Sequence, residues 1–266
     1  MDIIKDGAKH DTRPLDEKAK DYLHEELYSG LPPVWVERNI WKQTSQRIQD
    51  GSGSCIKQSS ATAVEVLTGN VISAGTYELR KNSPESGMVL QDCGDIDYNQ
   101  GTTLEQIVPS QNMNDAEMDA IKLPPLGTKI SGYRTIGTIA IDSIAEAIQA
   151  YGQCLLVFDS NTQEWLLTPV YLGTPTTFGH CICAIDYGLV GGVKTLCCKD
   201  SAGQFSSETG IRFITEDFLL KRCFGAMYYL GMQKPTPIGQ QQVSLTVIQQ
   251  FLALIKKLWG GIIPQY

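Results

Sequence analysis

The chain has 266 residues, of which 42% are hydrophobic and 19% are charged, and its formal net charge is −7. This composition excludes a disordered chain, and the length predicts one large domain with two lobes or two small domains. The negative charge argues against a nucleic-acid-binding protein, which would need a basic surface for phosphates. No segment approaches the roughly 20 apolar residues of a transmembrane helix, and the first residues do not resemble a signal peptide.

The first half of the chain carries one strong helical pattern. Residues 1–33 are charged and weakly patterned, so we interpret them as an N-terminal extension with one possible short helix at 15–27. A Gly/Ser loop then leads into a predicted helix at 55–67, where apolar or small residues recur at helical spacing and Gly69 is a plausible C-cap. Residues 70–138 are rich in turn-forming residues. The only helical hints there are short, such as the one at residues 102–107.

The second half of the chain has the pattern of a β-rich region. A helix is predicted at residues 142–151, with Gly152 ending it, and a turn at residues 190–192. The predicted strands are 154–158, 181–187, 194–198, 210–214 and 226–230. A helical half followed by a β-rich half predicts an α+β protein of two lobes, at about 34–138 and 139–233.

Residues 234–266 are interpreted as a linker followed by an amphipathic helix at 244–259. The apolar face of that helix is too wide to remain in contact with water. We therefore expect it to dock on the body of the protein or to mediate self-association. Coupling to a larger assembly and binding to a membrane surface remain alternatives, although two lysines make only a thin basic face.

The eight cysteines show no pattern of disulfide or metal-binding pairs. None lies in a CxxC motif, Cys181 and Cys183 alternate along a predicted strand, and Cys197 and Cys198 are adjacent. We expect most of them to be buried free thiols in a reducing compartment. The predicted location is therefore cytoplasmic or virus-associated, and we expect no metal and no cofactor.

Cys55 lies where a reactive thiol would be placed. A cysteine in the first turn of a helix has backbone N–H groups and the positive end of the helix dipole beside its sulfur, and both favour the thiolate. Gln49, six positions earlier, can bring its side-chain amide near the sulfur. With the Cys55 backbone N–H it would form a two-donor oxyanion hole. The structural alternatives are a cysteine that merely begins a helix and a solvated loop glutamine.

A thiolate nucleophile needs an imidazole, and the chain has three histidines. His10 and His24 lie in the extension, whereas His180 begins a predicted strand. Asp200 ends the next predicted strand and would orient the imidazole by accepting its N–H. Alternatively, His180 is an ordinary core or surface histidine and Asp200 is a turn former.

Three motifs in this order resemble those of the papain-like (C1) cysteine peptidases. The segment Gln49-x-Gly-Ser-Gly-Ser-Cys55 resembles Q-G-S-C-G-S-C of that family, and Lys199-Asp-Ser-Ala-Gly203 resembles K-N-S-W-G. Between them, Gly179-His180 and the strand that ends in Tyr-Gly resemble H-A-V…G-Y-G. The resemblance covers roughly residues 34–231, and residues 80–109 look more like bacterial and viral members than lysosomal ones.

The resemblance implies a fold and an activity. The fold would have a helical lobe and a β-barrel-like lobe with the active site in the cleft between them. The activity would be hydrolysis of peptide bonds through an acyl-enzyme on Cys55, with His180 as base, Asp200 as its partner and Gln49 in the oxyanion hole. For contacts to the peptide backbone we assign Gly94 and the Gly179 carbonyl, although Gly94 can equally be an ordinary turn glycine.

The sequence also departs from the family pattern. Ser52 stands in place of the first motif cysteine, Ile56 in place of an aromatic residue, Asp200 in place of asparagine and Ala202 in place of tryptophan. As a charge, Asp200 should favour the imidazolium more than asparagine would, and losing the tryptophan should expose that hydrogen bond to water.

Two alternatives stay open, the first of them motivated by these departures and by the apolar face of the C-terminal helix. One is a catalytically silent papain-like fold that serves as a binding or structural module, for example in a virus particle. The other is acyl transfer to an amine instead of hydrolysis. The N-terminal extension is too short for the family's long inhibitory prosegment, but it can still cover the active site.

Overall fold

The structure is a computed structural model and describes residues 6–18, 31–49, 51–81, 85–166, 170–202 and 210–233. The chain divides into two units, Met1–Met232 and Gln233–Tyr266. The predicted linker and amphipathic helix, residues 234–266, lie outside the described residues. Of the helix predicted at residues 15–27, the described part is α1, Leu15–Lys18.

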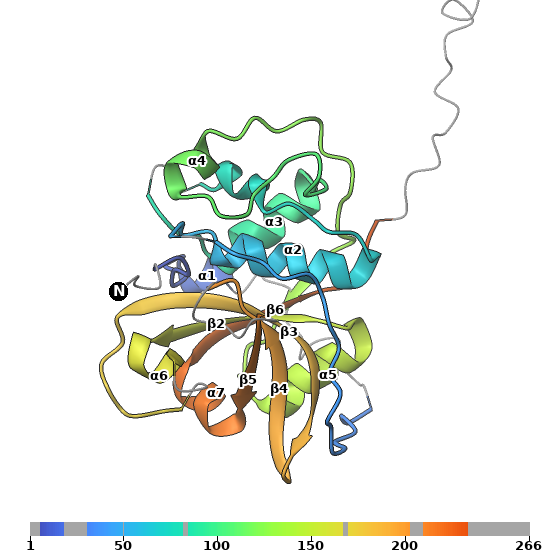
Figure 1. Ribbon diagram of the computed structural model, residues 1–266, viewed down its shortest axis with the longest axis vertical. Helices are drawn as coiled ribbons and strands as arrows, with labels where there is room; N and C mark the ends of the chain where they lie inside the picture. The colour runs from blue at the N-terminus through green and yellow to red at the C-terminus, as the bar shows by residue number, and fades with distance from the viewer. Residues whose placement is uncertain are drawn as a thin grey trace, which may run out of the picture. The chain divides into compact units, whose positions relative to one another are not determined.

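Six antiparallel strands form one sheet in the order β1-β6-β2-β3-β4-β5 (Figure 1). All five predicted strands are present, most of them longer than expected, and β1 adds an edge strand from within the half predicted to be helical. The turn between β3 and β4 contains Gly191 and Gly192, both with positive φ, as a two-residue hairpin requires. The strands are β1 Tyr133–Thr135, β2 Cys154–Ser160, β3 Phe178–Val190, β4 Val193–Lys199, β5 Ile211–Thr215 and β6 Cys223–Tyr229.

Both faces of the sheet are buried by helices. Along β2, Leu156 and Phe158 pack into one hydrophobic core, and Leu155 and Val157 pack into the other. Figure 1 shows α2 and α3 on one side of the sheet and α5 to α7 on the other. Because both faces are covered, the central strands are continuous apolar runs rather than alternating ones.

Two helices match the sequence prediction closely. Helix α2, Cys55–Thr68, ends at Gly69, which has a left-handed backbone and donates its N–H to the Glu65 carbonyl. Helix α5, Ile141–Tyr151, ends in the same way at Gly152. In both cases glycine supplies the positive φ that closes a helix C-terminus without a steric penalty.

The region predicted to be turn-rich contains a helix that the sequence pattern did not predict. Helix α3, Leu90–Asn99, includes a glycine and three aspartates, which have low helix propensity. It forms because Cys93 and Ile96 are buried against α2 and the sheet. The helical hint at residues 102–107 is wrong: Thr102 and Leu104 form isolated β-bridges there. The remaining elements are η1 Gly75–Leu79, α4 Asp115–Asp119, α6 Thr162–Leu166 and α7 Glu216–Arg222.

All eight cysteines are free thiols, and all but the half-buried Cys223 are buried. This burial agrees with the expectation that most of them act as small apolar residues. Within the described ranges, no helix has the length and apolar character needed to cross a membrane.

Candidate active site

Cys55 is the first residue of α2, and its side chain is fully buried. The loop before it is held closely: the Gly53 N–H donates to Asp115 Oδ1 over 2.8 Å, and Ser52 Oγ donates to the Gln49 carbonyl over 2.7 Å. A Cβ atom at Gly53 would lie 2.5 Å from the backbone nitrogen of Gly87, so only glycine fits there. The loop thus places the sulfur at the N-terminus of a 14-residue helix, which is the positive end of the helix dipole.

The topology of the sheet brings His180 and Asp200 together. His180 is the third residue of β3, and Asp200 directly follows β4, whose last residue Lys199 pairs with Cys183. The His180 ring donates from Nε2 to Asp200 Oδ1 over 2.8 Å. Its Nδ1 has no nitrogen or oxygen partner in the described part of the chain. The ring also interacts with Cys55, and with Nε2 used by Asp200, Nδ1 is the ring nitrogen left for the sulfur.

The electrostatics of the pair favour the charged imidazole. Burial disfavours the imidazolium, but the charge and hydrogen bond of Asp200, together with Cys55, raise the pKa of His180 to about 9. Burial also opposes ionisation of Asp200, yet His180 and Arg212 hold the pKa of that carboxyl well below its usual range. At neutral pH the sulfur therefore lies beside a protonated imidazole that is anchored by a carboxylate.

Gln49 is buried and connects the nucleophile loop to the Asp200 turn. Its Oε1 accepts from Ser201 Oγ over 2.7 Å, and its backbone N–H donates to the Ser201 carbonyl over 3.0 Å. Its Nε2 donates to the Ser52 carbonyl over 3.0 Å. An amide nitrogen has two hydrogens, so Gln49 keeps one donor for a ligand. These contacts exclude the interpretation of Gln49 as a solvated loop residue.

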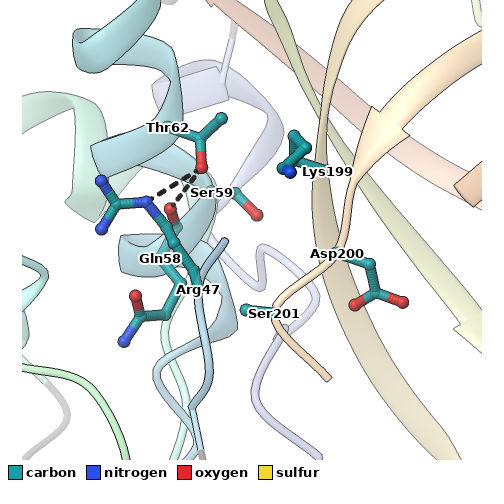
Figure 2. A pocket seen from close by; sticks show the side chains of 7 residues that line it. All are labelled: Arg47, Gln58, Ser59, Thr62, Lys199, Asp200 and Ser201. Carbon is teal, nitrogen blue, oxygen red and sulfur yellow. Dashed lines mark hydrogen bonds between the residues drawn. The ribbon is translucent and has the colours of Figure 1, made fainter. Parts of the chain in front are cut away.

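The second carboxylate oxygen of Asp200 has two partners that the sequence motifs did not indicate. Asp200 Oδ2 accepts from Arg212 Nε over 2.7 Å and from Trp165 Nε1 over 2.9 Å. Figure 2 shows the carboxylate turned away from Arg47 and from α2.

The small pocket drawn there lies between α2 and the end of β4 and is lined by Arg47, Gln58, Ser59, Thr62, Lys199, Asp200 and Ser201.

The beginning of the described chain lies across the site. The N–H groups of Gly7 and Ala8 donate to the Gly179 carbonyl over 3.0 and 3.1 Å. On the helical side, Met88 donates its N–H to the Gly7 carbonyl over 2.8 Å and accepts from the Lys9 N–H over 2.8 Å, which forms a parallel bridge. The segment therefore links the helical lobe to the β-rich lobe over Cys55, as the extension was expected to be able to do.

The fit between this segment and Cys55 is very close. A Cβ atom at Gly7 would lie 2.8 Å from Cys55 Sγ and 2.5 Å from the Gly53 carbonyl oxygen. Farther along, His10 Nε2 lies 2.7 Å from Asp159 Oδ2, and the His10 ring stacks on Phe224 with centroids 3.9 Å apart. No sequence motif indicated that this segment would lie here. Its close approach to Cys55 requires glycine at position 7, because a larger residue would not fit.

The two glycines assigned to peptide binding lie in different settings. Gly179 accepts two backbone N–H groups next to His180, as described above. Gly94 lies within helix α3, and a Cβ atom there would be 2.8 Å from the Tyr133 ring. On the helical side, the backbone that pairs with the N-terminal segment is that of Met88 and not that of Gly94. Gly94 instead allows close packing of Tyr133 against α3.

No family model and no curated protein matches this chain. Solved structures do match. Xylellain, a cysteine protease from Xylella fastidiosa, is 15% identical with a TM-score of 0.64, over 88% of this chain and 99% of that one. Digestive procathepsin L 3 of Tenebrio molitor is 16% identical with a TM-score of 0.62, over 85% and 76%. The Carica candamarcensis cysteine protease CMS1MS2, solved in complex with E-64, is 19% identical with a TM-score of 0.51, over 71% and 93%.

These neighbours establish the fold. The chain has the α+β fold of papain-like cysteine proteases, as the order of the three sequence motifs predicted.

Proposed function

We propose that this chain, which has the fold of the papain-like cysteine proteases, is a cysteine peptidase that acts through Cys55 and His180. The observation that carries the proposal is the arrangement of the His180 ring. Its Nε2 is bonded to Asp200, its Nδ1 is left for Cys55, and its pKa is raised to about 9. An imidazolium beside a sulfur at a helix N-terminus is the arrangement that a thiolate nucleophile requires.

The reaction follows from the positions of these groups. The Cys55 thiolate attacks the carbonyl carbon of a peptide bond, and the Cys55 N–H and the free Gln49 N–H bind the developing oxyanion. His180 gives its proton to the leaving amine as the C–N bond breaks, which leaves a thioester on Cys55. Neutral His180 then accepts a proton from water, whose oxygen attacks the thioester, and the acid product leaves with the thiolate restored.

Peptide binding is supported by the contacts of the N-terminal segment. The Gly179 carbonyl and both backbone groups of Met88 already hold an extended stretch of polypeptide by main-chain hydrogen bonds. We propose that a substrate peptide uses these same groups, in a short form of strand addition. Met88 takes the role that the sequence had suggested for Gly94.

The N-terminal segment itself is a non-productive occupant in this proposal. Its Gly7 carbonyl is bound by the Met88 N–H and not by the oxyanion donors. The carbonyl is therefore held out of the position in which it could be attacked. Because Gly7 contacts the sulfur, a substrate can reach Cys55 only after residues 6–9 have moved away. The segment should thus lower the activity of the full chain.

The test is covalent labelling of the full chain by E-64, followed by intact-mass measurement from pH 4 to 9. We expect one adduct on the wild type and none on Cys55→Ala. Cys93→Ala is the matched control, because Cys93 is also buried but its sulfur contacts Asp97 and Tyr229 instead of His180, and it should label like the wild type. Failure to label the wild type, or equal labelling of Cys55→Ala, would favour a silent binding module instead.

A further inference from the structure

We infer that Arg212 and Trp165 are positioning residues that allow an aspartate to orient the base in this fold. The inference rests on the proposed function, since it assigns roles in the same reaction. Asp200 and Ala202 replace the asparagine and tryptophan of the related motif, and each replacement has a counterpart in the structure. Arg212 neutralises the charge that the aspartate adds, and Trp165 shields the carboxylate from water in place of the missing ring.

Arg212 is placed for this role by strand β5. It pairs in register with Cys198, two residues before Asp200, and its side chain is 5% exposed. Its Nε donates to Asp200 Oδ2 over 2.7 Å, on the carboxylate oxygen that His180 does not use. Its Nη1 donates to the Trp165 carbonyl. A charged side chain inside an otherwise apolar strand is costly to bury unless it is paired, and here the pair is with the proposed site.

Trp165 comes from α6, an element that carries no motif. Its ring is fully buried and lies edge-on to the His180 ring, with centroids 5.2 Å apart. Its Nε1 donates to Asp200 Oδ2 over 2.9 Å, and the Arg212 guanidinium lies 4.8 Å from its ring centroid. The Trp165 side chain therefore contacts the base, the carboxylate and the arginine at once, and it excludes water from all three.

The net charge of the site explains how Arg212 would affect the base. In the reactive state, Cys55 and Asp200 are negative, whereas His180 and Arg212 are positive, so these four groups sum to zero. Without Arg212 the aspartate would hold the proton on His180 more strongly, and a base that holds its proton too strongly is a poorer acid toward the leaving amine. With asparagine at position 200 and arginine retained, the extra positive charge would instead favour loss of that proton.

Other ionisable side chains on the segments around His180 stay the same in the variants below. They are Asp6, Lys9 and His10 on the N-terminal segment, Asp159 on β2, Cys181 on β3 and Lys199 on β4.

The experiment measures the His180 pKa by NMR in the full chain, which has only three histidines, in a Cys55→Ala background. We expect Arg212→Gln to raise the pKa by about one unit and Asp200→Asn to lower it by about one unit. The double variant Asp200→Asn/Arg212→Gln should return toward the starting value. Trp165→Phe, which keeps the packing but removes the N–H donor, should move it by less.

A second readout uses the intact thiol. In chains that keep Cys55, we expect Asp200→Asn to slow E-64 labelling at least tenfold and the double variant to recover several-fold of that loss. Arg222→Gln is the matched control, because Arg222 braces the same helix α6 through Glu164 but does not contact Asp200. It should change the thermal midpoint without changing the His180 pKa.

The outcomes separate the two proposals. No movement of the His180 pKa in Arg212→Gln, or a double variant that is no better than Asp200→Asn alone, would show that Arg212 is only structural. If Arg212→Gln does not fold, the His180 pKa can be compared between two other variants. Arg212→Lys keeps the positive charge, and the double variant Asp200→Asn/Arg212→Gln removes both charges. Absence of E-64 labelling in the wild type would overturn the proposed function, while the NMR titration would still test Arg212.

Discussion

Two buried clusters of ionisable side chains, one around His180 and one around Asp97, differ in how their polar atoms are used. Asp97 accepts from Lys57, from Ser60 and, over 2.7 Å, from Tyr229 OH, while the Cys93 sulfur lies 3.8 Å from its Oδ2. Both clusters contain a cysteine and a charged pair, and both are closed to water. Burial and charge alone therefore do not identify the active site.

The two clusters differ in unused hydrogen-bonding capacity and in their cover. Burial raises the pKa of Cys93 to about 12, so that thiol stays neutral among partners that satisfy one another. Beside Cys55, in contrast, His180 keeps one ring nitrogen without a nitrogen or oxygen partner in the described residues. Cys93 and Cys55 belong to the same hydrophobic core, but at Cys55 residues 6–9 lie against the sulfur and are held by main-chain hydrogen bonds. A cover held by main-chain hydrogen bonds and a ring nitrogen without a nitrogen or oxygen partner in the described residues distinguish the candidate active site.

The largest expected effect on stability comes from breaking the ion pair in the Asp97 cluster. Asp97→Asn leaves Lys57, which is 1% exposed, with no opposite charge, although Asp97 normally overcomes burial and raises the pKa of that lysine. We expect the free energy of unfolding to fall by about 3 to 5 kcal/mol, measured by urea denaturation. The control is Asp142→Asn, since Asp142 pairs with Lys194 at the surface and should cost no more than about 1 kcal/mol. Equal losses in the two variants would mean that the Asp97 cluster is not a structural centre.

The pH dependence of stability should reveal the His180 cluster. The pKa of His180 is raised from 6.5 to about 9, so the folded state binds the proton more tightly than the unfolded state does. Its contribution is complete below about pH 6.5 and is lost as the pH rises through about 9. The free energy of unfolding of the wild type should therefore approach that of His180→Gln over this range, by about 3 kcal/mol. A difference that stays constant between pH 6 and 10 would contradict this pairing.

The smallest expected effect tests whether residues 6–9 limit access to Cys55. Gly7→Ala places a methyl group against the Gly53 carbonyl and Cys55 Sγ, so the segment must shift away from the sulfur. We expect E-64 labelling to become about tenfold faster, which corresponds to about 1.4 kcal/mol. Gly127→Ala is the matched control, because a Cβ atom there would meet no atom within 4 Å. Labelling that is unchanged or slower in Gly7→Ala would show that residues 6–9 do not limit access.

Much of the fold was predictable because it depends on local signals. Helix α2 and its cap at Gly69 follow from apolar spacing and one glycine, and the β3–β4 hairpin follows from Gly191 and Gly192. Helix α3 could not be predicted in the same way, because tertiary burial of Cys93 and Ile96 outweighs its poor helix propensity.

The candidate site was predictable only where motifs mark it. Cys55, His180 and Asp200 lie in recognisable segments, and the structure brings them together. The sequence indicated Arg212 only weakly: it is the one charged residue among apolar neighbours in a predicted strand, and it follows the aspartate that replaces asparagine. Trp165 left none, because its role depends on where α6 packs. Gly94, assigned from the resemblance, lies within a helix and not in a turn.

The contact between Gly179 and the N-terminal segment also has a consequence for synthesis. Gly7 and Ala8 are made long before Gly179, and the bond from Gly179 to Asp6 spans 173 residues of sequence. The cover can therefore close only after the ribosome has completed the start of β3. Gly179 directly precedes His180, so the strand that delivers the base also delivers the carbonyl that anchors the cover. Strand β3 must therefore form before either the His180 ring or the anchor of the cover is in place.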